Sequence, residues 1–312
     1  MSRSLSIIGW ILGAVGLCLI LDQTVITHPL VIPKGSLSER IGERLAVTDG
    51  SVSYDVLFLG DSTSSADIDP NLFSTLTGKS AAILSTVSPF NPVSDYVFMK
   101  RYLEHHQSPE AFVLLRHVSS VHNDVPASAF FDYFPDIRLT TSLYNKGLLS
   151  GLVLLRSFLS SAFPSLRDQG VLRNLVQAHL RNAAGIDGES LICTGALVIK
   201  PRTISTPRID TFPLLTLSLL QSMCTLAGEH NTKLLLTFSP ISSVDAQDAR
   251  TISALRKFQS IDQTIVSSES GCQIFMRDIP SYDNSLMADP SHLNVSGAQQ
   301  YTTTVAEKYL EQ

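Results

Sequence analysis

The stretch Asp55-Val56-Leu57-Phe58-Leu59-Gly60-Asp61-Ser62 decides the fold of this chain. A run of apolar residues leads directly into a Gly-Asp-Ser turn, which is the pattern of a buried strand that ends in a polar loop. Because the apolar residues are consecutive and do not alternate with polar ones, we expect helices on both faces of the strand, as in a parallel sheet. The pattern therefore predicts a serine at the edge of a sheet, just after its first strand.

Further along the chain, short apolar runs alternate with longer segments of helical periodicity. The expected strands are Val56–Leu59, Ala81–Thr86, Ala111–Leu115, Lys233–Phe238 and Gln273–Met276. The expected helices are Pro70–Leu76, Val93–His106, Phe212–Glu229, Ala246–Phe258 and Ser296–Leu310. This alternation predicts a doubly wound α/β domain with a parallel sheet of five strands. In such sheets a site forms beyond the carboxyl ends of the strands, where Ser62 is expected.

The N-terminal segment has the composition of a membrane anchor. Residues from Leu5 to Leu21 are apolar apart from one serine. These roughly 17 residues, at about 1.5 Å each, reach about 26 Å, which is close to the thickness of a hydrocarbon core. Arg3 precedes the segment and Asp22 follows it, which favours a cytoplasmic N-terminus. We therefore expect one uncleaved transmembrane helix over 1–22 of the plasma or inner membrane. A cleaved signal peptide is the alternative, although its apolar region would be unusually long.

This topology places the main domain outside the cytoplasm, in the periplasm if the cell is Gram-negative. Residues 23–50 are expected to form a linker, because two prolines and a glycine discourage regular structure early in it. The catalytic domain is expected over 51–312, interrupted at about 126–207 by a helical insertion. Within that insertion the apolar run 147–159 contains an arginine and several serines. Core packing and an interfacial or docking helix both remain open for it.

Composition narrows the classes of partner and cofactor. The net charge of -5 argues against nucleic acid as a ligand. One of the four cysteines, Cys18, lies in the expected anchor, so that at most one intrachain disulfide can join two of Cys193, Cys224 and Cys272. The sequence does not choose the pair. Neither paired cysteines nor a His-Glu-x-x-His spacing occurs, and we expect no metal and no other cofactor.

A histidine and an acid lie near the other end of the chain, in Asp289-Pro-Ser-His292. Ser296 and Gln299 have the spacing of a capping box, which predicts that the last helix begins at Ser296 and leaves the two residues on the preceding loop. A serine hydroxyl needs an adjacent base to become a nucleophile, and a carboxylate can orient a histidine for that task. The alternative is that all three residues belong to ordinary polar turns.

The two motifs resemble those of the SGNH, or GDSL-type, hydrolase superfamily. Its first block carries Gly-Asp-Ser after strand one, and its last block is Asp-x-x-His before the final helix. Both occur here, in that order, and the resemblance covers about 51–312 apart from the insertion. It implies a flavodoxin-like sheet, Ser62 as the nucleophile, His292 as general base and then general acid, and Asp289 as the residue that orients the histidine.

The middle blocks depart from the family pattern. Members usually carry a glycine after the second strand and an asparagine after the third, and both serve the oxyanion hole. Residues 81–92 contain no glycine, and their polar candidates are Ser85, Ser88 and Asn91. The run Val121-His-Asn-Asp124 resembles the family's Gly-x-Asn-Asp without its glycine. The candidate oxyanion and substrate-binding residues are Gly60, Asp61, Ser88 and Asn123, with Arg116 or His117 as alternatives to Asn123.

An anchored SGNH-like domain also resembles the membrane-tethered acyltransferases of cell-envelope polysaccharides, such as alginate O-acetylation proteins and the D-alanyl transfer protein of teichoic acids. This resemblance implies O-acyl transfer to a glycan through an acyl-Ser62 intermediate, with a multi-spanning membrane O-acyltransferase as partner. One alternative is an esterase or deacetylase that hydrolyses acyl esters. Another is a catalytically silent SGNH-like scaffold of a membrane acylation complex.

Overall fold

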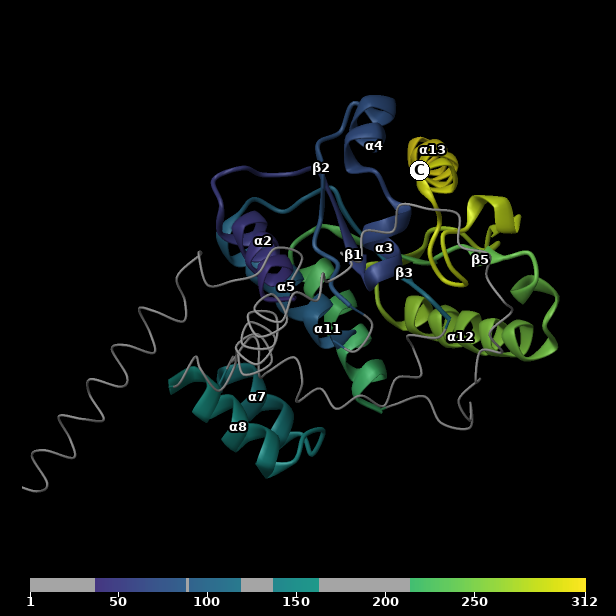
Figure 1. Cartoon of the computed structure of the whole chain (residues 1–312). Coiled ribbons are helices and arrows are strands. Elements are labelled where there is room, and N and C mark those ends of the chain that lie inside the picture. Colours follow the sequence, from purple (N-terminus) through teal and green to yellow (C-terminus); the bar gives the residue numbers. More distant parts are fainter. Residues whose placement is uncertain (1–36, 88–89, 119–136, 163–213) are drawn as a thin grey trace, which may run out of the picture. The chain divides into compact units, whose positions relative to one another are not determined.

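The computed structural model describes four segments of the chain, which are residues 37–87, 90–118, 137–162 and 214–312 (Figure 1). The chain divides into two compact units. The larger unit takes the described residues from 43 to 118 and from 214 to 312, and the smaller takes 37–42 and 137–162. The expected anchor lies outside these segments, and none of the helices inside them combines the length and apolar character needed to cross a bilayer.

The larger unit is built on a parallel sheet of five strands in the order β2-β1-β3-β4-β6. The strands are β1 (Val56–Gly60), β2 (Ala81–Ile83), β3 (Ala111–Arg116), β4 (Lys233–Phe238) and β6 (Cys272–Ile274). Every residue of β1 and β3 is buried, as expected for strands covered on both faces. The strand order is that of a flavodoxin-like fold, and all five strands were predicted from the apolar runs.

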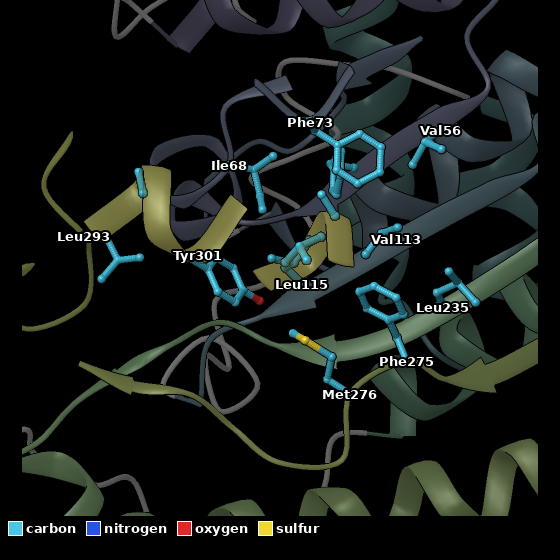
Figure 2. Close-up of a cluster of buried hydrophobic side chains, with 14 of the residues drawn as sticks. Val56, Ile68, Phe73, Val113, Leu115, Leu235, Phe275, Met276, Leu293 and Tyr301 are labelled. Atoms are coloured by element: carbon cyan, nitrogen blue, oxygen red, sulfur yellow. The ribbon is translucent and has the colours of Figure 1, made fainter. Parts of the chain in front are cut away.

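One face of the sheet packs against α3 (Ser62–Asp67), α4 (Pro70–Thr77) and α13 (Val295–Leu310). Figure 2 shows the core on this side, where Phe73, Leu293 and Tyr301 lie with strand residues such as Val113 and Leu235. In Figure 1, α13 (yellow) lies beside α4. The segment that follows β1 and the C-terminal helix therefore share one core, although they are far apart in the sequence.

The other face is covered by α5 (Val93–His105), α11 (Leu214–Glu229) and α12 (Ala249–Ser268). The ring of Tyr102 on α5 meets that of Phe112 on β3 edge to face, with centroids 6.1 Å apart. A disulfide joins Cys224 of α11 to Cys272 of β6, which settles the pairing that the sequence left open. Cys193, the third candidate, lies outside the described residues.

Several boundaries differ from the prediction. Helix α2 (Leu37–Asp49) forms inside the segment predicted as a linker. Helix α12 runs ten residues beyond the predicted end at Phe258. Strand β2 ends at Ile83, three residues before the predicted end, although the backbone N–H groups of Leu84 and Thr86 still donate to carbonyl oxygens of β1. A short parallel pair, β5 (Ile241–Ser242) and β7 (Ser281–Tyr282), was not predicted.

Besides the start of α2 (Leu37–Asp49), the described part of the smaller unit contains a helical pair, α7 (Ile137–Asn145) and α8 (Gly151–Ala162), within the predicted insertion. The two helices are joined by a hydrogen bond of 3.1 Å between the hydroxyls of Thr140 and Ser157, both of which are buried. The predicted apolar run 147–159 begins in the turn between them. Helix α8 buries Val153 and exposes Leu152, Leu155 and Phe158.

Candidate active site

Ser62 is the first residue of α3 and lies beyond the carboxyl end of β1. Gly60 is the last residue of the strand, and Asp61 is the N-cap of the helix. The Asp61 side chain accepts a hydrogen bond of 2.9 Å from the Thr63 backbone N–H, which satisfies one of the donors that a helix start leaves free. The strand-turn-helix path therefore fixes Ser62 at the sheet edge, as the sequence predicted, although the short helix itself was not predicted.

Gly60 has a φ of +131°, in the region that side chains with a Cβ rarely adopt. A Cβ at this position would lie 2.0 Å from the carbonyl oxygen of Leu115 on the neighbouring strand β3. Its backbone N–H donates to a carboxylate oxygen of Asp95 over 2.9 Å. Gly60 therefore turns the chain. Its N–H was predicted as an oxyanion donor, but in the structure this N–H donates to Asp95 instead.

Asp61 is 1% exposed and has structural partners. Besides capping α3, the oxygen that binds the Thr63 N–H also accepts from the Thr63 hydroxyl over 2.6 Å. That hydroxyl is in turn 2.6 Å from the hydroxyl of Ser239, which follows β4. The side chain of Asp61 therefore ties the nucleophile turn to the end of a central strand, whereas the sequence placed it among the substrate-binding candidates.

The acid and the histidine lie on a loop that closes on itself just before α13. The backbone N–H of Ala288 donates to the carbonyl oxygen of His292 over 2.8 Å. An isolated antiparallel bridge pairs Met287 with Leu293. Oδ1 of Asp289 accepts from the backbone N–H groups of Ser291 and His292, over 2.8 and 2.9 Å. These bonds hold the Asp289 carboxylate and the His292 ring on one rigid turn, which we call the histidine loop (287–293).

The structure brings the three predicted side chains into one chain of hydrogen bonds. Nε2 of His292 is 2.9 Å from the Oγ of Ser62, and Nδ1 of His292 is 2.7 Å from Oδ2 of Asp289. If the ring carries its proton on Nδ1, that N–H donates to the carboxylate, and Nε2 accepts from the serine hydroxyl. This is the arrangement in which an imidazole can take the serine proton.

The electrostatics of the pair favour an ionised acid and a basic histidine. Burial alone would raise the pKa of Asp289, but the hydrogen bonds from His292 and Ser291 outweigh it and lower the pKa to about 2. The hydrogen bond to Asp289 raises the pKa of His292, against the opposing effect of burial. The His292 side chain is 27% exposed and that of Asp289 is 41% exposed, so solvent and small molecules can reach both.

The structure describes only some of the residues that were predicted to form the oxyanion hole. Ser88 and Asn123 lie outside the described residues, and their oxyanion roles stay predictions. Arg116, an alternative to Asn123, forms a buried ion pair with Asp262 of α12, and its guanidinium lies 4.8 Å from the ring centroid of Phe238. These contacts engage Arg116 on the α12 face of the sheet. His117 is buried at the end of β3, and burial lowers its pKa, so that the neutral ring is favoured.

The other polar candidates after β2 also have partners. The hydroxyl of Ser85 is 2.5 Å from that of Ser65 on α3. Oδ1 of Asn91 accepts from Ser94 over 3.0 Å and from Thr86 over 3.4 Å. The Thr86 backbone N–H donates to the Gly60 carbonyl oxygen over 3.1 Å. This loop therefore lies against the nucleophile turn, as the sheet topology requires.

Sequence reasoning missed two buried acids beside the site. Asp95 on α5 holds the Gly60 N–H, and burial raises its pKa to about 7. Asp67 at the end of α3 accepts from the Leu293 N–H over 2.9 Å, and burial raises its pKa to about 7 as well. In the sequence, Asp95 cannot be told from a solvated helix acid, and Asp67 lies in a short helix that was not predicted.

Comparisons with known proteins add little to this geometry. No family model matches the sequence, and no curated protein matches it either. A solved structure described as "a putative platelet activating factor from Streptococcus pneumonia" aligns with 97% of this chain and 99% of its own. Its sequence is 13% identical and the TM-score is 0.37, so we draw no conclusion from this likeness.

Proposed function

We propose that this protein cleaves acyl esters through a covalent acyl-Ser62 intermediate. The observation that supports the proposal is the continuous hydrogen-bonded chain from Ser62 through His292 to Asp289 at the carboxyl edge of a parallel sheet. Ligands bind at this edge in open α/β sheets, and both the serine and the histidine are half-buried rather than sealed from solvent. The resemblance of both motifs to the SGNH superfamily leads to the same proposal.

The proton transfers of the proposed reaction follow the hydrogen bonds of Ser62, His292 and Asp289. Nε2 of His292 takes the hydroxyl proton as Oγ of Ser62 bonds to the acyl carbon of the ester. The imidazolium is stabilised by the Asp289 carboxylate, which stays ionised because its pKa is low. As the bond between the acyl carbon and the alcohol oxygen breaks, the imidazolium returns the proton to the leaving alcohol. A second hydroxyl then gives its proton to His292 and bonds to the acyl carbon. As the bond between the acyl carbon and Oγ of Ser62 breaks, His292 returns the proton to Oγ, which restores Ser62.

The identity of that second hydroxyl separates hydrolysis from transfer. Water yields a free carboxylic acid, whereas a sugar hydroxyl yields an acylated glycan. We propose the transfer route, with a cell-envelope glycan as acceptor and a multi-spanning membrane O-acyltransferase as donor partner. Two features support an extracytoplasmic domain, on which this route depends. One is the apolar segment of 1–22, and the other is the Cys224–Cys272 disulfide, because disulfides persist in oxidising compartments.

The experiment is intact-protein mass spectrometry of the full-length protein in detergent after incubation with p-nitrophenyl acetate. We expect one acetyl adduct on the wild type and none on Ser62→Ala. Ser65→Ala is the matched control, because it removes a second serine from the same helix and leaves the hydrogen bond to His292 intact. We expect the control to be acetylated as the wild type is. A folded wild type without an adduct, or an adduct that persists on Ser62→Ala, would contradict the proposal and favour a silent scaffold.

The rate of adduct formation should also depend on pH in one direction. His292 accepts the proton only when its ring is neutral, and the hydrogen bond to Asp289 raises its pKa above the ordinary histidine value. Acetylation should therefore slow as the pH falls through that raised pKa. His292→Ala should lower the rate by about 10²–10⁴ and remove this dependence. An unchanged rate in His292→Ala would exclude His292 as the base.

Acceptor assays distinguish the two outcomes of the acyl-enzyme. Purified acetyl-Ser62 protein is mixed with oligosaccharides from candidate envelope glycans, and the products are analysed by mass spectrometry. Transfer gives an oligosaccharide heavier by one acetyl group, and hydrolysis gives free acetate with an unmodified oligosaccharide. Release of acetate alone at every acceptor concentration would replace the transfer route with an esterase.

A further inference from the structure

Helix α3 begins with Ser62 and ends with Asp67. The helix is only six residues long, so its two ends are held in a fixed relation by a single element. Asp67 is fully buried. An ionisable side chain is rarely buried completely without a partner, and its contacts show what the burial accomplishes.

Oδ1 of Asp67 accepts a hydrogen bond of 2.9 Å from the backbone N–H of Leu293, which is 226 positions away and directly follows His292. The Leu293 side chain is 4% exposed and belongs to the core that Figure 2 shows, as does Ile68, which follows Asp67. The end of α3 therefore holds the histidine loop at the residue next to the imidazole.

Two further bonds fix the same end of α3 against the C-terminal helix. The hydroxyl of Thr302 on α13 accepts from the Asp69 N–H over 2.9 Å and donates to the Asp67 carbonyl oxygen over 3.5 Å. These bonds use the backbone groups of Asp69 and Asp67 and not the Asp67 carboxylate. The carboxylate contact with Leu293 is therefore separate from the packing of α3 on α13, and the two can be removed independently.

We propose that Asp67 is a positioning residue, which holds His292 at hydrogen-bonding distance from Ser62 and places a negative charge near the imidazole. The inference rests on the proposed function, because it assigns a role in the Ser62–His292 pair. One helix then sets both partners, since its first residue carries the hydroxyl and its last residue holds the loop that carries the base. Errors of about 1 Å in such a pair can lower the rate about 10²-fold.

The charge of Asp67 acts electrostatically on His292. Its second oxygen, Oδ2, is buried with no hydrogen-bond partner among the described residues. When Asp67 is ionised it stabilises the His292 imidazolium, and it is one of the charges that raise the pKa of His292, after Asp289. The titratable groups that face Asp67 from the neighbouring elements are Asp61, Tyr282, Asp289, His292 and Tyr301.

The test compares Asp67→Ala, Asp67→Asn and Thr302→Val in the full-length protein. Alanine removes both the acceptor and the charge, and we expect kcat for acetyl ester turnover to fall by about 10–10²-fold with little change in KM. Asparagine keeps an acceptor for the Leu293 N–H and removes the charge. We expect it to restore turnover at alkaline pH and to shift the acid limb of the pH profile downward, because the imidazolium loses a stabilising charge.

Thr302→Val is the control for simple loosening of α3 against α13. It should lower the melting temperature and leave kcat and the pH profile of the folded protein unchanged. If Asp67→Ala turns over ester as fast as the wild type, the inference is wrong. It is equally wrong if the pH profile of Asp67→Asn coincides with that of the wild type. Should Asp67→Ala fail to fold, the Asp67→Asn profile decides alone.

A titration independent of activity separates this inference from the proposed function. The His292 ring is followed by NMR in wild type and Asp67→Asn protein labelled at histidine. We expect the pKa of His292 to be lower in the variant, whether or not Ser62 is acetylated. An inactive wild type with this shift would overturn the proposed function and retain the Asp67–His292 coupling. An active wild type with no shift would overturn the inference alone.

Discussion

Gly60 shows how one residue sets the position of the nucleophile. It has a positive φ, and a Cβ there would collide with the Leu115 carbonyl oxygen. We expect Gly60→Ala to lower the free energy of unfolding by at least about 3 kcal/mol, since strain and collision add. Gly78→Ala is the matched control, because Gly78 also has a positive φ but faces open space. It should cost roughly 1–2 kcal/mol. Urea denaturation measures both, and equal costs would show that the collision is relieved.

The buried carboxyl group of Asp95 should make the free energy of unfolding depend on pH. Burial raises its pKa from 3.8 to about 7, with Asp61 opposing ionisation and Arg116 favouring it. Between about pH 4 and pH 7 the unfolded chain loses this proton while the folded protein keeps it. The contribution of Asp95 to stability is therefore lost as the pH rises through 7. Relative to the wild type, Asp95→Asn should become more stable as the pH rises from about 4 to about 7, as measured by urea unfolding. Stability curves that stay parallel would contradict this.

At the residue scale, the sequence predicted what short motifs encode. Ser62 follows an apolar run, and Asp289 and His292 are three positions apart, so local pattern was enough to nominate all three. Asp67 and Asp95 could not be nominated in the same way. Their importance comes from burial and from contacts with Leu293 and Gly60, distant in the sequence, and a single sequence does not reveal either.

At the element scale, the start of α13 shows where local pattern misleads. The capping-box spacing of Ser296 and Gln299 predicted a helix start at Ser296, and this was wrong. The N-cap is Asn294, whose side chain accepts from the Gly297 N–H over 3.1 Å. Its amide also donates to the Ser285 carbonyl oxygen over 2.7 Å, which joins the helix to the preceding 3-10 turn. Tertiary contact therefore selects the cap that the spacing rule passed over.

The two candidate N-caps, Asn294 and Ser296, predict different effects of an alanine substitution on the free energy of unfolding. Asn294→Ala should lower the free energy of unfolding by about 0.5–2 kcal/mol, because the Gly297 N–H loses its acceptor. Ser296→Ala, on an exposed side chain within the first turn, should change it by less than about 0.5 kcal/mol. Chemical denaturation of the two variants makes the comparison. A larger loss in the serine variant would reinstate the predicted capping box.

Helix α2 was missed because intrinsic preference is a weak guide to an isolated segment. Residues 37–49 contain no proline, and their contacts lie elsewhere in the chain. The Arg44 side chain donates to the Ser85 carbonyl oxygen over 3.0 Å, and Asp49 accepts from Arg101 on α5. The prolines that favoured a linker precede this stretch. The linker prediction applied the prolines near the start of residues 23–50 to the whole segment, and so it missed the helix that begins at Leu37.

For the whole molecule, the sheet was the most predictable feature. Five apolar runs in a repeated strand-helix order predicted the parallel sheet, and the observed order follows the flavodoxin-like arrangement. The disulfide was not predictable, because three cysteines allow three pairings. Only the fold brings α11 beside β6, with 5.0 Å between the Cα atoms of Cys224 and Cys272.

The disulfide closes a part of the chain that contains β4 and α12, and the two cysteines have a sequence separation of 48. Constraint of the unfolded chain should stabilise the fold by about 2–4 kcal/mol. We expect the double variant Cys224→Ala/Cys272→Ala to lose this amount in urea denaturation. A reducing agent should destabilise the wild type by a similar amount and leave the variant unchanged. Equal stability of oxidised wild type and variant would show that the bond adds nothing.

The distance of 230 positions between Ser62 and His292 also matters while the chain is being made. Synthesis runs from the N-terminus at about 5–20 residues per second, so the serine leaves the ribosome roughly 10–50 s before its base exists. During that interval the nascent protein carries an ordinary hydroxyl and cannot attack an ester. Timing alone would then keep the unfinished chain from acylating itself until the histidine loop docks on α3.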